Sequence, residues 1–286
     1  MAARLANLDG RAQLLDEELC IDVEKRSEGR FGPDPMPLLE QWEAFRAWAE
    51  AQRADAADAR LDPAHLGPCV PRPRSVFAIG LNYRDHAEEA GLEAPSSPMV
   101  FTKFPGCLAG PRADIALGSD RVDWEVELVV VIGRAGRGIP EARALDHVAG
   151  YCVGQDISDR RLQFSDKPPQ FSLGKSADGY GPIGPALASL DAFADPNDLA
   201  ISCDLDTLRV QESRTRNLIF SVPELVAYLS RTCTLAPGDL IFTGTPGGVG
   251  SVREPRRYLR EGDVLRSRIE GIGELVNRCV AAREPG

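Results

Sequence analysis

The stretch that decides the fold is VDWEVELVVVIG, Val122 to Gly133, in which polar and apolar residues alternate before the chain becomes wholly apolar. Alternation with a period of two predicts a β-strand, and the apolar run after it predicts burial on both faces of a sheet. In such a strand Glu125 and Glu127 point to the same side, roughly 6.6 Å apart along the axis. Two carboxylates held so close to a buried segment need a counter-charge.

A divalent cation would supply that counter-charge, because carboxylate oxygens at positions i and i+2 of a strand can converge on a hard ion. A third carboxylate, Asp156, closes the later apolar run HVAGYCVGQD, where we expect another strand to end. Three oxygen ligands with places left for water suit Mg²⁺ or Mn²⁺, with Ca²⁺ as a further option. The alternative interpretation is an ordinary solvated strand face, on which polar residues point outward.

Around this stretch, the chain beyond residue 70 consists mostly of short apolar runs separated by Gly, Pro and Asp. Runs of this length that are rich in Val and Ile predict strands. The clearest are SVFAIG, PMVFTKF, GPIGPAL, DLAISCDLD, DLIFTG and DVLRSRIEG. Helical patterns are limited to NYRDHAEEAG and VPELVAYLSRTC. Because strands and helices do not alternate regularly, we expect an α+β, β-rich fold with a mixed sheet rather than a doubly wound one.

The N-terminal region has a pattern of its own. Two short strands are expected around Asp9-Gly10, a dipeptide that accepts the positive φ angles of a tight hairpin turn. Apolar residues then recur at helical spacing from Leu38 to Ala49 and predict an amphipathic helix. A proline-rich segment follows, which can neither continue a helix nor donate to a sheet. We therefore predict a small N-terminal domain, 1–70, and a larger catalytic domain, 71–286.

Composition excludes several classes of protein. The formal charge of -10 over 286 residues, with no cluster of Lys and Arg in the sequence, argues against a nucleic-acid partner. No apolar run reaches 18 residues and the N-terminus lacks the apolar core of a signal peptide, so we expect a cytoplasmic protein with no membrane partner. The seven cysteines are widely spaced and form no C-x-x-C pair, which predicts reduced, packed thiols.

A glycine-rich segment, TGTPGGVG from Thr243 to Gly250, resembles a phosphate-binding loop only superficially. It lacks the Gly-Lys-Ser/Thr ending that supplies the phosphate-binding cation, so nucleotide binding is disfavoured. Its glycines would let backbone amides approach a small anion. The alternative is a tight turn after a strand.

Six motifs follow one another between about Val76 and Asn277: GLNYRDHAEEAG, VDWEVELVVVIG, GYCVGQDISDR, LGKSADGYGPIGP, LAPGDLIFTGTPGGVG and GDVLRSRIEGIGELVN. In this order they resemble the fumarylacetoacetate hydrolase family, in its short form. That form includes acylpyruvate hydrolases, oxaloacetate decarboxylases and 2-hydroxyhepta-2,4-diene-1,7-dioate isomerases. The resemblance implies the β-sheet roll or sandwich of the family's C-terminal domain with a small N-terminal α/β appendage, and a homodimer.

The resemblance also implies a metal site. The second and third acids of the D-x-E-x-E segment and the aspartate that closes the later strand bind a divalent cation in the family, which points to Glu125, Glu127 and Asp156. This agrees with the expectation from strand geometry. Asp123 then has a structural role or supports the ligands.

The motif NYRDHAEEAG predicts a short helix that Asn82 caps and Gly91 ends, with His86 and Glu89 on one face. A carboxylate bonded to one imidazole nitrogen raises the basicity of the other, which makes a general base for water. For an arbitrary sequence a surface His-Glu pair is the ordinary interpretation. The resemblance instead implies a catalytic dyad, on a lid segment that ligand orders.

Four further residues match family positions near the substrate. Lys175 matches a lysine that would stabilise enolate charge, and its alternative is a surface amine. Arg160 and Gln163 match positions facing the pocket, where a guanidinium suits a carboxylate, and their alternative is an exposed loop. Thr245 matches a threonine that hydrogen-bonds the substrate carboxylate.

Together these residues imply a hydrolase that depends on a divalent metal and cleaves a carbon–carbon bond in a 1,3-diketo acid, with a place in aromatic catabolism. The substrate would be a small keto or enol acid, cleaved through an enolate held at the metal. Alternatives on the same site are an oxaloacetate decarboxylase and a 2-hydroxyhepta-2,4-diene-1,7-dioate isomerase, because each route passes through an enolate. A non-catalytic metal-binding interaction module is a further alternative. The departures from family pattern at Gln155, Arg161 and Gly179 leave the substrate open.

Overall fold

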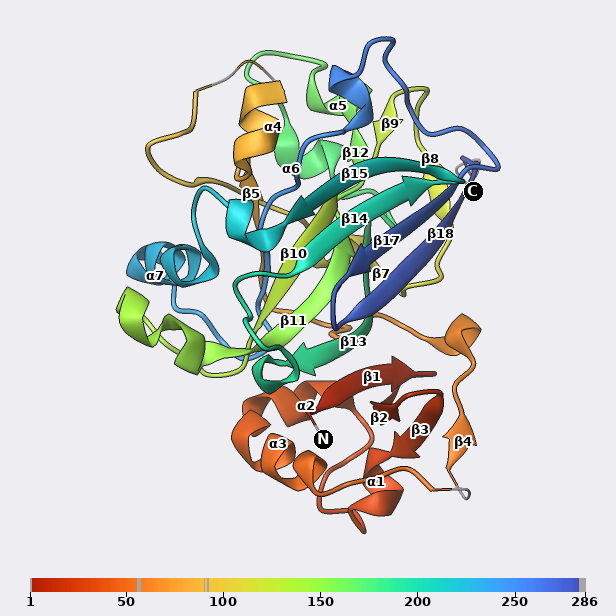
Figure 1. Cartoon of the computed structure of the whole chain (residues 1–286), viewed down its shortest axis with the longest axis vertical. Coiled ribbons are helices and arrows are strands. Elements are labelled where there is room, and N and C mark those ends of the chain that lie inside the picture. Colours follow the sequence, from red (N-terminus) through yellow and green to blue (C-terminus); the bar gives the residue numbers. More distant parts are fainter. Residues whose placement is uncertain (1, 56–57, 90, 92, 283–286) are drawn as a thin grey trace.

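The computed structural model describes residues 2–55, 58–89, 91 and 93–282 (Figure 1). Its largest element is an 11-stranded mixed sheet, in which the strands of the N-terminal region continue those of the rest of the chain. In spatial order the strands are β4 (Ala59–Arg60), β3 (Leu19–Asp22), β2 (Arg11–Asp16), β1 (Arg4–Leu8), β13 (Gly181–Ser189), β11 (Val148–Gln155), β10 (Val126–Ile132), β16 (Leu240–Phe242), β5 (Val76–Gly80) and β6 (Met99–Thr102), with β7 (Leu108–Ala109) beside β13.

A second, five-stranded sheet packs against the central strands. Its order is β15 (Leu208–Arg214), β14 (Ala200–Leu205), β17 (Val264–Ile269), β18 (Gly273–Ala281) and β8 (Ile115–Leu117). A short ladder joins β9 (Val122–Asp123) to β12 (Ser158–Asp159). The expected α+β, β-rich fold is thus confirmed.

The helices are short. They are α1 (Val23–Arg26), α2 (Pro35–Glu40), α3 (Trp42–Glu50), α4 (Arg84–Glu89), α5 (Arg160–Gln163), α6 (Phe171–Gly174) and α7 (Val222–Thr232). 3₁₀ helices occur at η1 (Pro63–His65), η2 (Pro105–Cys107), η3 (Glu141–His147), η4 (Leu190–Ala192), η5 (Thr215–Asn217) and η6 (Gly250–Val252). In Figure 1, α4, α5 and α6 gather at the upper end of the molecule, whereas the N-terminal strands and helices form the lower end. The sequence pattern predicted α4 and α7, but not α5 and α6.

Strand β10 explains why VELVVVIG is apolar on both sides. Its seven residues are all buried. Leu128 and Val130 belong to a core shared with the five-stranded sheet, whereas Val129 and Val131 belong to a core shared with the N-terminal helices. Because successive side chains point to opposite faces, one strand contributes to two cores.

The N-terminal region folds largely as its pattern indicates. The hairpin of β1 and β2 turns at Asp9 and Gly10, whose φ angles are 52° and 83°. The single expected helix is two, because the chain breaks between α2 and α3 at Gln41, whose φ and ψ are -118° and 33°. The predicted apolar stripe is nonetheless buried; it consists of Leu38, Trp42, Phe45 and Ala49. A division of the chain into two domains at residue 70 stays a prediction.

Two expectations from composition bear on the described residues. All seven cysteines are free, and every one except Cys233 is buried. None of the helices described here combines the length and the apolar character that crossing a bilayer requires.

Candidate metal centre and active site

The acidic site lies where β10 begins and β11 ends. These strands are antiparallel neighbours, with Val126 opposite Gln155. The extended stretch expected from Val122 onward is interrupted at Trp124 and Glu125, which belong to no strand. There the Gln155 side chain accepts the Glu125 amide at 2.9 Å, and the next backbone amide, that of Asp156, donates to the Glu125 carbonyl at 2.9 Å. These bonds hold the two segments together beyond the regular ladder.

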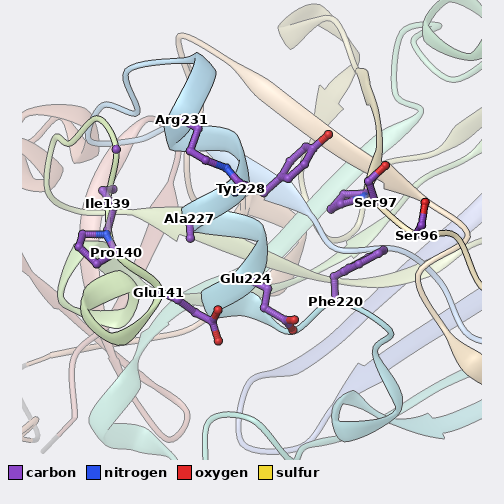
Figure 2. A pocket seen from close by; sticks show the side chains of 12 residues that line it. Ser96, Ser97, Ile139, Pro140, Glu141, Phe220, Glu224, Ala227, Tyr228 and Arg231 are labelled. Carbon is purple, nitrogen blue, oxygen red and sulfur yellow. The ribbon is translucent and has the colours of Figure 1, made fainter.

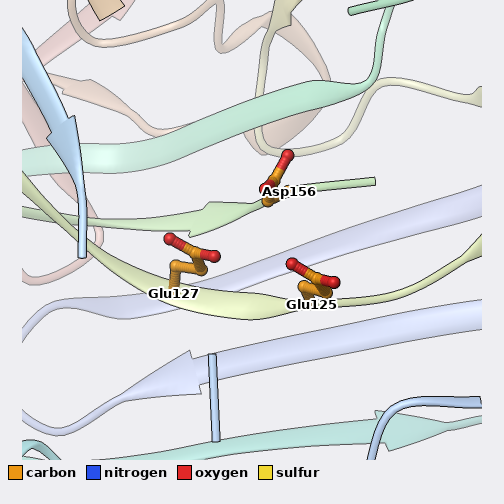
Figure 3. A group of neighbouring side chains, drawn as sticks. All are labelled: Glu125, Glu127 and Asp156. Atoms are coloured by element: carbon orange, nitrogen blue, oxygen red, sulfur yellow. The ribbon is translucent and has the colours of Figure 1, made fainter. Parts of the chain in front are cut away.

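Three carboxylates converge at this place, as Figure 3 shows. One ligand oxygen from each of Glu125, Glu127 and Asp156 lies within 4.8 Å of the others. The residues are only 7%, 1% and 0% exposed, respectively. A solvated strand face is therefore the wrong interpretation of the alternating acids.

Two buried lysines contact the acids. The Nζ atom of Lys175 lies 2.7 Å from a carboxylate oxygen of Glu125 and 2.7 Å from one of Asp156. Lys103 donates to the other oxygen of Asp156 at 2.7 Å, to the Tyr180 carbonyl at 3.1 Å and to the Lys175 carbonyl. The sequence interpretation missed Lys103. The one feature of the sequence that pointed to Lys103 was the presence of a charged residue near the end of the apolar run PMVFTKF.

Glu127 is balanced less well than its neighbours. Its carboxylate accepts the Gly244 amide at 2.8 Å, and within the described residues no basic group lies within ion-pair distance. Burial, followed by the negative charges of Asp156 and Glu125, raises its pKa well above the ordinary value. For Glu125, burial also acts to raise the pKa, but Lys175 and Arg160 outweigh it and hold the pKa below the ordinary value.

Arg160, on α5, connects several residues of the site through hydrogen bonds. Its three guanidinium nitrogens contact Asp123 at 2.9 Å, Glu125 at 2.6 Å and the Gln163 side-chain oxygen at 2.9 Å. The first residue before α5, Asp159, accepts two backbone amides of the helix and so fixes where it begins. Arg160 was expected to face a substrate carboxylate. It does line the cavity, but its contacts are with the protein's own acids.

Asp123 is a fully bonded structural acid. Besides Arg160, it accepts the backbone amides of Trp124 at 2.9 Å, Gly250 at 2.7 Å and Ser251 at 3.0 Å. It thereby fastens the glycine-rich segment to the start of the acidic stretch. Within this buried network, four carboxylates with Asp123 included face three cations, Lys103, Arg160 and Lys175. One negative charge is in excess when all of them are ionised, so the donor set fits an oxygen-bound divalent cation.

The glycine-rich segment supports the acids from the other side. Gly244 has a φ of 99°, and a Cβ there would lie 2.8 Å from the Cβ of Asn82, so this position favours glycine. The Thr245 hydroxyl donates to the Val126 carbonyl at 2.9 Å and accepts from the Gln211 amide at 2.8 Å. Both bonds hold Thr245 in the wall of the cavity.

Helix α4 carries His86 and Glu89 to the edge of the cavity. The His86 Nδ1 and Glu89 Oε2 atoms are 3.6 Å apart, beyond a hydrogen bond, and Nδ1 is buried without a hydrogen-bond partner. Glu89 instead accepts the Gly248 amide at 2.8 Å, and Asp85 accepts the Gly247 amide at 3.3 Å. The helix is therefore fastened to the glycine-rich segment. The two side chains lie close, as the sequence predicted.

Asn82 does not cap α4, which corrects the expectation from sequence. Its side-chain amide donates to the carbonyls of Phe220 at 3.0 Å and Thr243 at 2.8 Å and accepts the Phe220 amide at 2.8 Å. Both N–H groups and the oxygen of its amide are thus directed to these two segments instead of the first turn of a helix that begins at Arg84. Residues 90 and 92, next to the predicted helix end, lie outside the described residues.

A cavity of about 380 Å³ collects the predicted residues in one place. Six of the nine line it, namely His86, Glu125, Arg160, Gln163, Lys175 and Thr245. Glu127 and Asp156 do not line it but have ligand oxygens within 4.8 Å of one of Glu125, and Glu89 lies 3.6 Å from His86. A larger hollow of about 540 Å³ between α7 and η3 contains no comparable acid cluster among the described residues (Figure 2). Its Glu224 is engaged in capping α7 with Ser221.

Comparison with known proteins agrees with this geometry. The model of the fumarylacetoacetate (FAA) hydrolase C-terminal domain matches residues 75–280. The crystal structure of a Mycobacterium smegmatis protein described as HpcE is similar, with a TM-score of 0.92 and 52% identity, covering 98% of this chain and 100% of that one. A probable 2-hydroxyhepta-2,4-diene-1,7-dioate isomerase from Mycobacterium abscessus gives a TM-score of 0.84 at 27% identity, covering 100% of each chain.

A third similar structure is maleylpyruvate hydrolase from Sphingobium sp. SYK-6, in complex with a manganese(II) ion and pyruvate. Its TM-score is 0.80 at 28% identity, and the match covers 98% of this chain and 100% of that one. Both hydrolases and isomerases thus share the fold, which supports an enzyme. The chain belongs to the fumarylacetoacetate hydrolase family.

Proposed function

We propose that the protein is a hydrolase that depends on a divalent metal and cleaves a carbon–carbon bond in a 1,3-diketo acid. The observation that carries this proposal is one cavity whose wall contains an imidazole, His86, and one member of a buried acid cluster, Glu125. A structural ion would need the acids but not His86. The similarity to a maleylpyruvate hydrolase that holds manganese and pyruvate supports the same reaction class.

Glu125, Glu127 and Asp156 would hold Mg²⁺ or Mn²⁺. When bound, such an ion supplies Lewis-acid polarisation of a keto acid and neutralises charge that develops on it. With the ion present, the network of four acids and three basic groups changes from one negative charge in excess to one positive charge in excess. The site would therefore attract a monoanionic head group such as an α-keto carboxylate.

The residues of the chain provide the proton transfers. His86 takes a proton from water as the water oxygen forms a bond to the distal carbonyl carbon of the substrate. The bond between that carbon and the neighbouring methylene then breaks, and its electron pair remains as the enolate of pyruvate. Return of the proton to the methylene carbon completes pyruvate, and the acyl part leaves as a carboxylic acid.

Lys175 would stabilise the enolate. Burial alone would lower the pKa of its ammonium group, but Asp156 and Glu125 outweigh burial and raise the pKa. The side chain is therefore a cation at the floor of the cavity, where negative charge develops during cleavage. Glu89, 3.6 Å from His86, would orient the imidazole once the two groups close to hydrogen-bond distance.

Two other reactions use the same enolate, so they remain alternatives. Decarboxylation of oxaloacetate and isomerisation of 2-hydroxyhepta-2,4-diene-1,7-dioate need no attack by water, and the similarity to a probable isomerase favours keeping the second. A metal-binding interaction module is the alternative without catalysis. We include a homodimer in the proposal on the strength of family resemblance, and sedimentation of the purified chain would test it.

The experiment measures pyruvate and carboxylic acid released from acetylpyruvate by the full chain with Mn²⁺ and with EDTA. Equal amounts of both products, formed only with Mn²⁺, are expected. His86→Asn should lower kcat by about 10²- to 10⁴-fold while Mn²⁺ affinity is retained. His65→Asn, on an exposed histidine of the N-terminal region, is the matched control and should leave kcat unchanged. Turnover of oxaloacetate or of the hydroxydienoate alone would replace the proposal with the corresponding alternative.

A further inference from the structure

The cavity is divided into a polar floor and an apolar mouth. The floor contains Glu125, Arg160 and Lys175. The apolar lining consists of Ile79, Leu81, Met99, Phe101, Phe164, Phe171, Val249 and Val252, of which Ile79 and Val249 are as deeply buried as the floor and the others lie toward the mouth. Three of these are unusually exposed for large apolar side chains: Phe164 at 58%, Met99 at 42% and Val252 at 39%. An exposed apolar patch around a cavity marks a binding surface more often than chance exposure does.

The apolar mouth begins directly at the floor. The Lys175 Nζ atom lies 5.3 Å from the centre of the Phe101 ring. The Phe101 and Phe171 rings are 5.5 Å apart, and those of Phe171 and Phe164 are 6.4 Å apart. A row of three aromatic rings therefore leads from the expected enolate position to solvent.

This row is held in place by the pairing of α5 with α6. The Gln170 amide donates to the Gln163 carbonyl at 2.8 Å. A Cβ on Gly174 would lie 2.9 Å from the Cα of Gln163, so the two short helices approach at backbone contact. Because Phe164 and Phe171 lie on these helices or next to them, the close approach keeps their rings adjacent.

The two strongly basic side chains that line the cavity, Lys175 and Arg160, are paired with acids at its floor. Lys175 contacts two acids and Arg160 contacts two acids and Gln163. Among the described lining residues, His86 is the one other basic side chain, and it lies at α4. Within the described lining, the mouth thus offers no cation to a second carboxylate on the distal end of a substrate.

We infer that the mouth selects 1,3-diketo acids whose distal tail is an uncharged alkyl or aryl group, over acids whose tail ends in a carboxylate. This inference rests on the proposed function and names its substrate class. The keto acid end lies at the polar floor, and the tail lies along the three rings. A second carboxylate in that place would exchange water for apolar side chains without gaining a partner.

The test is a matched pair of substrates. Fumarylpyruvate and crotonylpyruvate differ in one terminal group, a carboxylate or a methyl. With Mn²⁺, kcat/KM for crotonylpyruvate should exceed that for fumarylpyruvate at least about tenfold. In the series acetyl-, butanoyl- and hexanoylpyruvate, kcat/KM should rise up to about fourfold per methylene buried, equivalent to about 0.8 kcal/mol.

A variant at the rim supplies a second measurement. Phe164→Arg places a cation at the mouth and should shift the crotonyl-to-fumaryl ratio toward fumarylpyruvate at least about fivefold. Leu208→Arg is the matched control, because Leu208 is 60% exposed and lies on β15 outside the lining of the cavity. That variant should leave the ratio unchanged.

The outcomes separate this inference from the proposed function. Preference for fumarylpyruvate would overturn the inference and leave the hydrolase intact. Release of pyruvate from none of these acids would remove the hydrolase, and the inference with it. If Phe164→Arg alters the mass of the assembly in solution but not the substrate ratio, the rings cover a second copy of the chain instead of a substrate tail, which also overturns the inference.

Discussion

Asp123 and Glu127 lie four residues apart in one buried stretch, and their surroundings differ. Asp123 has three backbone amides and the Arg160 guanidinium around its two oxygens. Glu127 has one backbone amide, with two further carboxylates within 4.8 Å. Burial is nearly the same, at 0% and 1% exposure. Burial of an acid therefore does not by itself identify a metal ligand, and for Glu127 the shortage of partners is the further observation that supports our proposal.

The difference assigns separate tasks to the two ends of the stretch. Asp123 joins the glycine-rich segment, α5 and the start of the acidic stretch into one unit, so its charge is part of the fold. Glu127 brings a charge that the fold leaves unbalanced. Replacing Asp123 should therefore lower the stability of the fold, whereas replacing Glu127 should lower the activity.

The largest effect is expected from Glu127→Gln. Turnover of acetylpyruvate should fall at least about a thousandfold, equivalent to about 4 kcal/mol of transition-state stabilisation, because a proposed metal ligand is lost. The free energy of unfolding of the metal-free protein should stay the same or rise, since the amide oxygen still accepts from Gly244 and like-charge repulsion is removed. Steady-state kinetics and urea unfolding check both parts. A large loss of stability without metal would make Glu127 a structural acid like Asp123.

Much of the acid site could be predicted from the sequence, because the positions of its residues follow local patterns. The two-residue period of VDWEVEL brought Glu125 and Glu127 to one side, and the end of an apolar run placed Asp156 beside them. Three residues from His86 to Glu89 make slightly less than one helical turn, which brought these side chains close. Local geometry of this kind requires no knowledge of the rest of the chain.

The features of the site and fold that the sequence did not predict depend on partners far away in the sequence. Asn82 bonds to segments 138 and 161 residues further along, and these bonds override its ordinary tendency to cap a helix. Lys103 reaches Asp156 across 53 residues and ends wholly buried, which no spacing indicates. The pairing of β1 with β13, which extends the central sheet with the N-terminal hairpin, is of the same kind. Tertiary contacts determine these three features, so the periodicity of the sequence alone could not predict them.

The next largest effect is expected from Asp123→Asn. Both carboxylate oxygens accept hydrogen bonds, so the amide NH₂ group would face a donor whichever way the side chain is turned. Arg160 would also lose one of its buried acids. We expect a loss of about 3 kcal/mol in the free energy of unfolding of the metal-free protein, measured by urea denaturation.

Asp198→Asn is the control for this loss. Asp198 also contacts two arginines, Arg214 and Arg216, but at the surface, where water screens the pairs, so its substitution should cost much less. Equal losses for the two variants would mean that the buried position of Asp123 adds nothing, and the contrast with Glu127 would fail.

The smallest effect is expected from addition of Mn²⁺ to the unchanged protein. An ion that binds the folded chain at a hundred times its Kd should add about 2.7 kcal/mol to the free energy of unfolding. Glu127→Gln should abolish most of this gain, since the unbalanced charge is what the ion neutralises. Asp123→Asn should keep a gain of similar size on its lower baseline, because Asp123 already has its partners. An equal gain in Glu127→Gln would place the ion elsewhere, and the acid cluster would then be an ion-pair network that the two lysines and Arg160 complete.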